Sequence, residues 1–508
     1  MNSLISLILL AATLVAQSDA ALPHTKNSLC ALSLIDSLAE PSQKAGALID
    51  IAKLYLKAGN KVAADQLLFE SFKWIAVTKR GLFKAGRLGD LLEIASREHL
   101  VRAVGIGKSI PGTDGVWALR DLIVAHSRLG LRDEANELLS EAVRRTLARN
   151  KNEVWYGDQD LELAQLFGTA AKAGLVQRAL RGAREIKNPW VRAEALYPAA
   201  IKLAEDKQCQ QALPVARSIH YEIERIDALV DVAYTCTSTG DKLTAGSALS
   251  YALAETRKDI FDPAQDTKTK ALTSISLAYE KLGQRTPAMA ILKRAEKLAY
   301  TIEKPGFKDS GLSQVALAYA EYGSFDDAFR VTSQIPSPWS DIKSNTLATI
   351  GSYLFAAGNR DKALTILSQA EQIAKDVDCT YFKYGISTRS CFGGKVSDFL
   401  KIASVYERNH VFDKESAVLD LAVMNNQYKV KPPHPIIEDG PSVIGDYAVG
   451  EMDIVKGYLA VGQFNKAIQA ASAMADPKER VVGVATIEFN LASDNSDALK
   501  LLRSTFGC

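Results

Sequence analysis

The apolar residues fall into pairs of amphipathic segments that are separated by short turns, and most of these turns contain a glycine. Two stretches show the pattern, residues 51–68 (IAKLYLKAGNKVAADQLL) and residues 122–139 (LIVAHSRLGLRDEANELL). They align at Gly59 and Gly130, with an alanine five positions later and a Leu–Leu pair eight and nine positions later. Apolar residues at this spacing share one face of an α-helix. The pattern predicts an antiparallel pair of helices around each turn.

A turn of this kind recurs twelve times along the chain. Glycine stands at the turn at Gly59, Gly130, Gly174, Gly240, Gly283, Gly323, Gly358 and Gly462, and another residue replaces it at Glu98, Lys207, His410 and Ser493. Glycine ends a helix well because it adopts the left-handed conformation without steric cost. The small alanine allows the second helix to cross close to the first. We therefore predict an all-α fold, an α-solenoid of about twelve antiparallel helix hairpins.

The second helix of the predicted hairpin comes in two lengths. Where the residue twelve positions after the turn is Ala or Ser, the next turn follows 39 to 52 residues later, and where it is Ile or Met the next turn follows 31 to 35 residues later. In the second class a proline often comes at once, as at Pro111, Pro189 and Pro336. Proline cannot continue the helical hydrogen bonds, so we expect long and short hairpins to be mixed.

The repeated frame resembles the tetratricopeptide repeat. Units of that family carry a small residue seven positions before the turn glycine, an aromatic residue four before, and alanines five and twelve after. Ser276, Tyr279, Gly283, Ala288 and Ala295 match most of this pattern. The resemblance covers nearly the whole chain after the first twenty residues, although the family's tryptophan is mostly missing. It implies a superhelical stack whose groove is built from the first helix of each hairpin.

The resemblance also selects candidate groove residues, which lie 13, 10, 6, 3 and 2 positions before a turn. In three repeats this count gives Trp117, Arg120, Arg128, Tyr234 and Lys270 as candidates for binding. Ordinary contacts between stacked repeats are the alternative role for each of the five. The Lys/Asn carboxylate clamp of chaperone-binding members is absent, so a mixed polar and apolar peptide surface is expected.

The N-terminus predicts export. Residues Leu4–Ala16 are almost wholly apolar and would form a helix of about 20 Å, too short for a hydrocarbon core of about 30 Å. Small residues then precede Ala21, as at a signal-peptide cleavage site. We predict a signal peptide over residues 1–20, a helical-repeat region over 21–508 and a secreted or periplasmic location. A buried helix of the first repeat is the alternative for the apolar stretch.

Two predicted loops, near 376–395 and 426–446, are longer than a connection between helices needs. Cys379 and Cys391 bracket part of the first loop and are candidates for a local disulfide, because an exported chain meets oxidising surroundings. The sequence contains no Asn-x-Ser/Thr glycosylation site, which favours a bacterial envelope over a glycosylating pathway.

The other four cysteines lie within or at the ends of the repeats. Cys209 lies two positions after one turn and Cys236 lies four before the next, so a disulfide between neighbouring hairpins is one interpretation. Two separate cysteines in helix cores are the other. Cys30 and Cys508 stand at opposite ends of the sequence, and we expect them to be free rather than paired.

Composition and charge exclude several classes of function. The chain is 47% hydrophobic and 24% charged, as in ordinary globular proteins, and 61 Lys and Arg balance 59 Asp and Glu. A nucleic-acid-binding protein would normally show a basic excess. The six histidines form no metal-binding motif, and phosphate-loop, nucleophile-elbow and dinucleotide motifs are absent. We therefore expect no enzyme activity, cofactor or metal, and no nucleic-acid partner.

The function predicted from these features is an exported, non-enzymatic helical-repeat protein that binds a protein or peptide as a scaffold or adaptor. The first alternative is a secreted α/α-toroid enzyme acting on glycans, which needs two carboxylates across a cleft. Its candidate residues in the two long loops are Asp376, Asp378, Glu438 and Asp439. The second alternative is a structural role without a groove ligand.

Overall fold

The computed structural model describes residues 29–148, 159–257, 266–335, 341–377, 388–426, 445–491 and 496–508. These ranges contain 25 α-helices and one short 3₁₀ helix, and no strand occurs in them. After α2 (Cys30–Leu34), twenty-four helices from α3 to α26 follow one another along the chain, the number that twelve hairpins require. The prediction of an all-α solenoid of helix hairpins is therefore confirmed over the described ranges.

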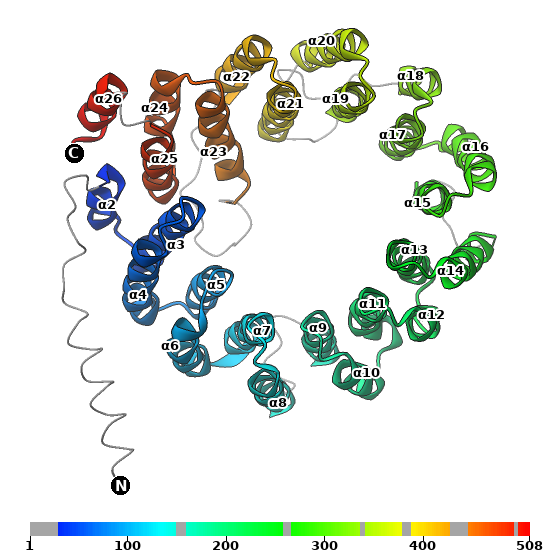
Figure 1. The fold of residues 1–508 in the computed structure, drawn as a ribbon, viewed down its shortest axis with the longest axis horizontal. Coiled ribbons are helices and arrows are strands. Elements are labelled where there is room, and N and C mark those ends of the chain that lie inside the picture. Colours follow the sequence, from blue (N-terminus) through cyan, green and yellow to red (C-terminus); the bar gives the residue numbers. More distant parts are fainter. Residues whose placement is uncertain are drawn as a thin grey trace. The chain divides into compact units, whose positions relative to one another are not determined.

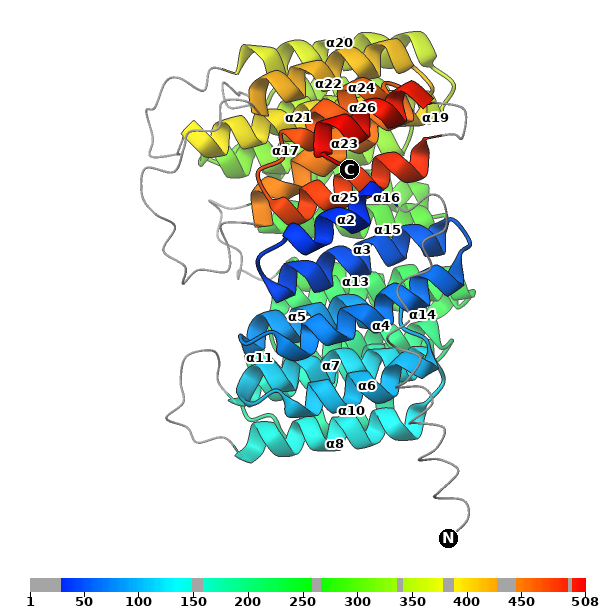
Figure 2. The same cartoon turned by 90° about the vertical axis from the view of Figure 1, so that its left-hand side faces the viewer.

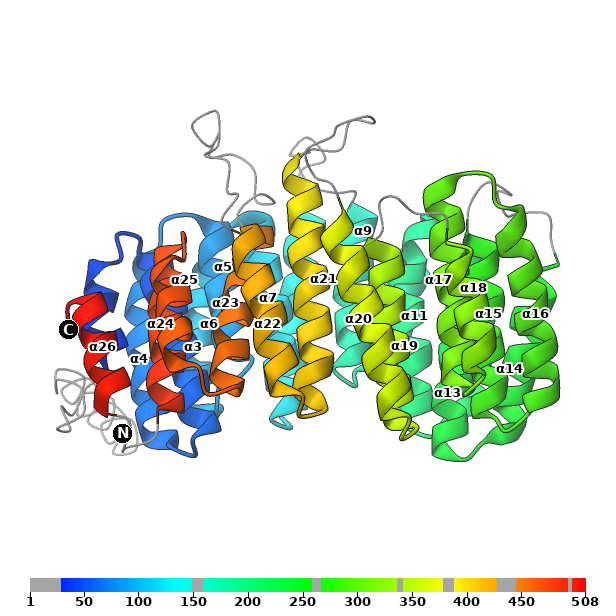
Figure 3. The same cartoon turned by 90° about the horizontal axis from the view of Figure 1, so that it is seen from above.

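The chain divides into two compact units, and the larger one comprises Lys79–Gln463. The first helices of its hairpins lie side by side in an inner row, and the second helices lie against them in an outer row (Figure 1). Seen from above, the axes of neighbouring helices in this unit are roughly aligned, while consecutive helices run in opposite chain directions (Figure 3). The inner row comprises α5 (Gly81–Leu92), α7 (Gly112–Arg128), α9 (Gln159–Lys172), α11 (Pro189–Glu205), α13 (Glu222–Thr239), α15 (Thr267–Lys281), α17 (Pro305–Glu321), α19 (Asp341–Ala356), α21 (Thr388–Arg408) and α23 (Gly445–Ala460). The outer row comprises α6 (Arg97–Ser109), α8 (Arg132–Ala148), α10 (Val176–Glu185), α12 (Cys209–Arg217), α14 (Lys242–Glu255), α16 (Arg285–Thr301), α18 (Phe325–Ser333), α20 (Arg360–Asp376) and α22 (Phe412–Asn426).

The smaller unit combines the two ends of the chain, residues up to Thr78 together with Phe464–Cys508. Helix α25 packs against both α2 and α3, and Figure 2 shows the three side by side. The helices of this unit are α2, the 3₁₀ helix η2 (Ile35–Ser37), α3 (Pro41–Lys57), α4 (Lys61–Val77), α24 (Phe464–Ser472), α25 (Pro477–Asn490) and α26 (Ser496–Phe506). The first and last hairpins of the sequence are thus direct neighbours.

The backbone at the turns explains the repeated glycine. All eight predicted turn glycines have positive φ, between 71° at Gly462 and 99° at Gly240. Lys207 and His410, two of the weaker matches, also have positive φ, 60° and 56°. Both residues therefore adopt the same left-handed conformation as the turn glycines. They do so at a steric cost, because their Cβ atoms crowd the backbone in this conformation.

The predicted turn at Glu98 is wrong, and the one at Ser493 lies outside the described residues. Glu98 is already inside α6, which begins at Arg97. The turn before it ends in a capping box in which the His99 ring accepts the backbone N–H of Ser96 at 3.1 Å. Side-chain capping replaces the left-handed residue at this turn.

In most hairpins a buried alanine stands early in the second helix, five positions after the predicted turn residue, whereas after His410 this position is Glu415, which is 1% exposed. The alanine is 0% exposed in ten hairpins: Ala64, Ala103, Ala135, Ala179, Ala212, Ala245, Ala288, Ala328, Ala363 and Ala467. A larger side chain at such a position would force the helices apart, because packed interiors have no spare volume. The prediction of two helix lengths is also confirmed, since α4, α8, α16 and α20 have 17 residues whereas α12, α18 and α24 have nine.

Tyrosines in the first helices connect successive hairpins. The residue four positions before the turn donates its hydroxyl hydrogen to a carboxylate on the second helix of the preceding hairpin. The pairs are Tyr319 with Glu296 at 2.7 Å, Tyr406 with Glu371 at 2.6 Å and Tyr458 with Asp420 at 2.7 Å. Burial and the hydrogen bond to the carboxylate raise the pKa of Tyr406 above its ordinary value. Each bond therefore joins two neighbouring repeats.

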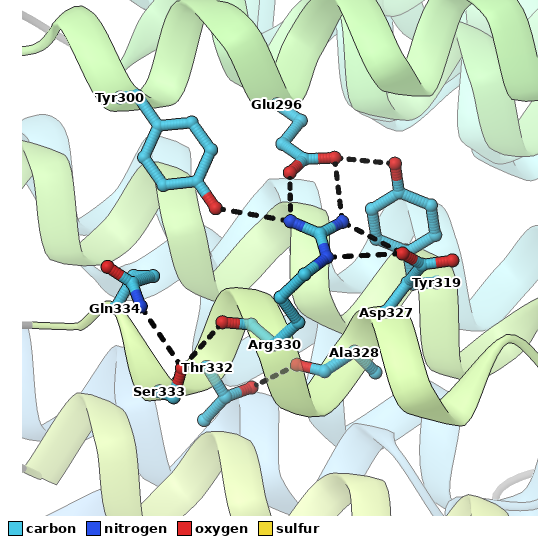
Figure 4. A network of polar contacts seen from close by, with 9 residues as sticks. All are labelled: Glu296, Tyr300, Tyr319, Asp327, Ala328, Arg330, Thr332, Ser333 and Gln334. Carbon is cyan, nitrogen blue, oxygen red and sulfur yellow. Dashed lines mark hydrogen bonds and ion pairs between the residues drawn. The ribbon is translucent and has the colours of Figure 1, made fainter.

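Figure 4 shows the largest of these connections, which joins three helices. Glu296 on α16 accepts hydrogen bonds from Tyr319 on α17 and from Arg330 on α18, the latter at 2.5 and 3.3 Å. Arg330 is held in turn by Asp327 at 2.8 Å. Burial acts to raise the pKa of Glu296, but the hydrogen bonds from Arg330 and Tyr319 lower it overall. The carboxylate is thereby kept charged at a buried position.

Cys30 and Cys508 form a disulfide, with their Cα atoms 5.4 Å apart. The expectation that both would be free is wrong, because α25 brings the end of the chain back to its beginning. Polar contacts support the same packing: Glu488 accepts the N–H of Cys30 at 2.6 Å and of Ala31 at 3.1 Å. Lys478 on α25 also lies 2.6 Å from Asp50 on α3. The two ends are therefore held by a covalent bond, a helix cap and an ion pair.

Cys209 and Cys236, one of the two candidate pairs, form a disulfide between α12 and α13 with a Cα separation of 5.9 Å. Cys379 and the side chain of Cys391 lie outside the described residues. The long loops are only partly described, and the chain is helical again from Thr388, inside the range predicted as the first loop.

The predicted signal peptide, residues 1–20, lies outside the described residues. Among the helices that the structure describes, none is both long enough and apolar enough to cross a membrane.

Replacing Tyr406 with phenylalanine should destabilise the protein by about 1–3 kcal/mol, because it leaves a buried carboxylate of Glu371 without its donor. Tyr279→Phe is the matched control, since Tyr279 occupies the same repeat position, is 8% exposed and makes no side-chain hydrogen bond with another described residue. Urea unfolding of the two variants measures the difference. If Tyr406→Phe and Tyr279→Phe lower the free energy of unfolding equally, the hydroxyl of Tyr406 makes no special contribution to stability.

Cys508→Ser should lower the free energy of unfolding by about 2–4 kcal/mol, because the disulfide restricts the unfolded chain. The same substitution in the presence of a thiol reductant should have no further effect through this bond. Thermal unfolding with and without reductant tests both statements. A Cys508→Ser variant as stable as the parent in oxidising buffer would contradict the assignment of this disulfide.

Candidate functional site

The inner row contains a cavity of about 590 Å³ over α11, bordered by α9 and α13. Its lining residues are Lys172 on α9, then Ala193, Glu194, Tyr197, Pro198, Ile201, Lys202 and Glu205 on α11, and Glu224 and Asp231 on α13. Residues three, four and seven positions apart lie on one face of a helix, so one face of α11 supplies most of the lining. The cavity lies wholly within the larger unit.

The floor of the cavity is apolar and tightly supported. Ala193, Pro198, Ile201 and the ring of Tyr197 contribute carbon surface to its lining, and we call these four residues the floor. Helices α9 and α11 approach closely at Gly168, where a Cβ atom would lie 2.5 Å from the carbonyl oxygen of Glu194. Only glycine permits this approach, and the resulting backbone contact fixes the position of α11 in the inner row.

The rim of the cavity is charged, and acidic residues are in the majority. Four carboxylates line it, against the two ammonium groups of Lys172 and Lys202. Lys202 is already bound, at 3.2 Å from Glu205 and 2.9 Å from Asp206. These bonds to carboxylates raise the pKa of Lys202, so it stays protonated. The charge that is left without a partner at the rim is therefore mainly negative.

Two polar groups on the α13 side have contrasting environments. Tyr197 donates its hydroxyl hydrogen to Asp231 Oδ2 at 2.5 Å, which links α11 to α13. Burial and this bond raise the pKa of Tyr197. Glu224 Oε2 is shielded from solvent and accepts no hydrogen bond from the described residues. Burial, together with Asp227, Glu194 and Glu222 nearby, raises the pKa of Glu224.

The structure gives two of the five predicted groove residues contacts between repeats. Arg120 on α7 donates to Gln165 at 3.0 Å and to Thr169 at 3.3 Å, both on α9. Arg128 donates to the backbone carbonyl oxygens of Leu92 and Ala95 at 2.9 Å each, and to that of Glu93. Arg128 thus satisfies carbonyls at the end of α5, which the helix leaves without partners.

The other three predicted residues lie on the inner row away from these contacts. Trp117 and Tyr234 are half-buried, on α7 and α13, and Lys270 is exposed on α15. Lys270 lowers the pKa of Asp227, although burial keeps that pKa above its ordinary value overall. None of the five lines the cavity over α11.

The sequence did contain a signal for this cavity. Counting back from the turn at Lys207 by the same rule gives Glu194, Tyr197, Ile201, Ala204 and Glu205, and all but Ala204 line the cavity. The five groove candidates predicted from the sequence come from three other repeats, those that precede Gly130, Gly240 and Gly283. The positive φ of Lys207 shows that it is a full member of the series.

The acidic residues proposed for the alternative enzyme remain mostly untested. Asp376 is exposed at the end of α20, where it accepts a hydrogen bond from Gln372 at 2.7 Å. Asp378, Glu438 and Asp439 lie outside the described residues. In the part of the chain that the structure describes, no group of three or more His, Cys, Asp or Glu side chains is placed to hold a metal ion.

Comparisons with known proteins return helical-repeat structures at low similarity. No protein-family model matches the sequence, and no curated protein matches it. The Rap protein complexed with competence and sporulation factor is 12% identical, with a TM-score of 0.29 over 70% of this chain and 98% of that one. A signal transduction ATPase with numerous domains from Pyrococcus horikoshii, which has a tetratricopeptide repeat sensor, is 13% identical, with a TM-score of 0.25 over 91% of this chain and 71% of that one. The APC/C hetero-tetramer Cut9–Hcn1 is 12% identical, with a TM-score of 0.23 over 97% and 94%. Scores at this level carry no conclusion about function.

Two of the predicted basic residues should respond differently to substitution. Arg128→Ala should destabilise the protein by about 1–3 kcal/mol, because it leaves backbone carbonyls of α5 without a charged donor. Lys270→Ala removes an exposed side chain and should change stability by less than about 0.5 kcal/mol. Chemical unfolding of the two variants measures this, and equal effects would contradict the structural role of Arg128.

Proposed function

We propose that this chain is an exported, non-enzymatic helical-repeat protein that binds a protein or peptide segment on its inner row and acts as a scaffold or adaptor. The observation that supports this most directly is the cavity over α11, which combines an apolar floor with a charged rim. Such a combination suits a peptide, because carbon surface supplies affinity and a few polar groups supply orientation.

Binding on the inner row has a physical rationale in the repeat architecture. Each first helix buries one face against its own second helix and leaves another face toward the inner side. A row of such faces offers an extended surface whose spacing is fixed by hairpin packing. The side chains over α11 are held by the bond between Tyr197 and Asp231 and by the close contact at Gly168, so little order has to be gained on binding.

Export is part of the same proposal. The apolar N-terminal stretch followed by small residues supports it. The two disulfides, Cys30–Cys508 and Cys209–Cys236, also support it, because such bonds persist in oxidising compartments and are rare in reducing ones.

The test is selection of binding peptides from a random peptide display library on the purified, disulfide-bonded chain. Peptides that bind should lose about tenfold or more in affinity to the Ile201→Arg variant, because an arginine there would occupy the cavity floor. Leu243→Arg is the matched control, since Leu243 is 83% exposed on the outer helix α14. It should leave the affinity within about twofold.

Thermal unfolding of both variants verifies that each is folded before binding is compared. If no peptide is selected, or if every selected peptide binds Ile201→Arg as well as it binds the parent chain, the proposed function is wrong for this surface.

A further inference from the structure

The inner face of α11 carries a continuous stripe of aromatic, acidic and apolar residues. Trp190, Glu194, Tyr197, Ile201 and Glu205 follow one another at intervals of four, three, four and four positions. This spacing places them along one side of the helix. The last four line the cavity, and Trp190 extends the stripe toward the beginning of α11.

Trp190 is an unusual surface residue because it is 56% exposed. Its ring lies 4.8 Å from the ring of Tyr221 and 6.0 Å from that of His220, measured between ring centroids. Tyr221 is the residue that immediately precedes α13. Two aromatic rings therefore stand beside the first turn of α13, which carries Glu224. Exposed tryptophan and tyrosine rings attract cations through their negative faces.

The charges around the stripe repel one another in the absence of a ligand. Glu194 and Glu205 on α11 face Glu224 and Asp231 on α13 across the cavity, and Asp227 lies between the latter two on α13. Of the two lining lysines, Lys202 is engaged by Glu205 and Asp206, which leaves Lys172 on α9 as the one further ammonium group against four carboxylates. The shielded Glu224 Oε2 has no hydrogen-bond donor among the described residues. A buried carboxylate oxygen without a donor is costly, and a cationic ligand would supply one.

We propose that the α11 face binds a cationic peptide segment, with arginine or lysine side chains on either side of an apolar residue. This inference rests on the proposed function and specifies the partner's chemistry at the same cavity. The basic side chains pair with Glu194 and Glu224 and lie against the rings of Trp190 and Tyr221. The apolar side chain packs on the floor made by Pro198 and Ile201. Affinity comes from the floor, and selectivity for cations comes from the rim.

The test uses two synthetic peptides of equal length, one of arginine, leucine and serine and one in which glutamate replaces each arginine. Isothermal titration calorimetry with the full disulfide-bonded chain should show the arginine peptide binding at least about tenfold more tightly. Its affinity should fall as salt is raised, because the rim charges are partly exposed and are screened by ions.

The double variant Glu194→Gln/Glu224→Gln removes two rim charges with little change in shape. It should weaken binding of the arginine peptide about tenfold or more. Glu134→Gln/Glu137→Gln is the matched control, because both residues are exposed on the outer helix α8 and neither makes a side-chain bond. That variant should leave the affinity within about twofold.

The outcomes separate this inference from the proposed function. If the glutamate peptide binds as tightly as the arginine peptide, or if the two double variants have equal effects, the cationic specificity is wrong. The proposed function still stands in that case, provided that display-selected peptides are sensitive to Ile201→Arg. If neither synthetic peptide binds and the display also yields no such peptide, both proposals are wrong.

Discussion

The close crossing of the two helices in each hairpin is the constraint on which the rest of the structure depends. It requires a reversal that takes very few residues and, in most hairpins, a small side chain at the crossing, although Glu415 occupies this position after His410. The left-handed residue meets the first requirement, and the fully buried alanine five positions later meets the second. With this turn and this small residue in place, the second helix packs on one side of the first helix. The opposite side of the first helix is left uncovered by its own hairpin and faces the inner side of the row. The cavity over α11 is therefore a consequence of packing on the far side of the same helices.

Three of the junctions between hairpins carry a directional contact in addition to packing. At these junctions a buried tyrosine hydroxyl donates to a carboxylate of the preceding hairpin. Such a bond is directional, so it fixes how far one hairpin rotates against the next as well as holding them together. Tyr279 makes no such bond with another described residue, so the junction before its hairpin lacks this contact. The stiffness of the array should therefore vary along its length.

Much of this fold could be predicted from the sequence because the rules of a hairpin are local. The glycine turns, the buried alanines and the two lengths of second helix all follow from spacing within about forty residues. Glu98 was misassigned because its turn uses the Ser96–His99 capping box instead of a left-handed residue. The Cys30–Cys508 bond was missed because no local pattern reports that the last hairpin packs on the first. The cavity over α11 was not predicted, because the candidate groove residues came from the repeats that precede Gly130, Gly240 and Gly283, whereas the cavity lies in the repeat that precedes Lys207.

The bond between Cys30 and Cys508 has a mechanical consequence. In an ordinary repeat array the outermost units have a neighbour on one side only, so they fray first and need polar caps. Here α25 of the last hairpin packs on α3 of the first, so each of these two hairpins has a neighbour on the side that an end unit would otherwise expose. A force that pulls on the two ends would be carried by the sulfur–sulfur bond before any helix is stretched. A pulling force could therefore separate the first and last hairpins only after the Cys30–Cys508 disulfide has been reduced.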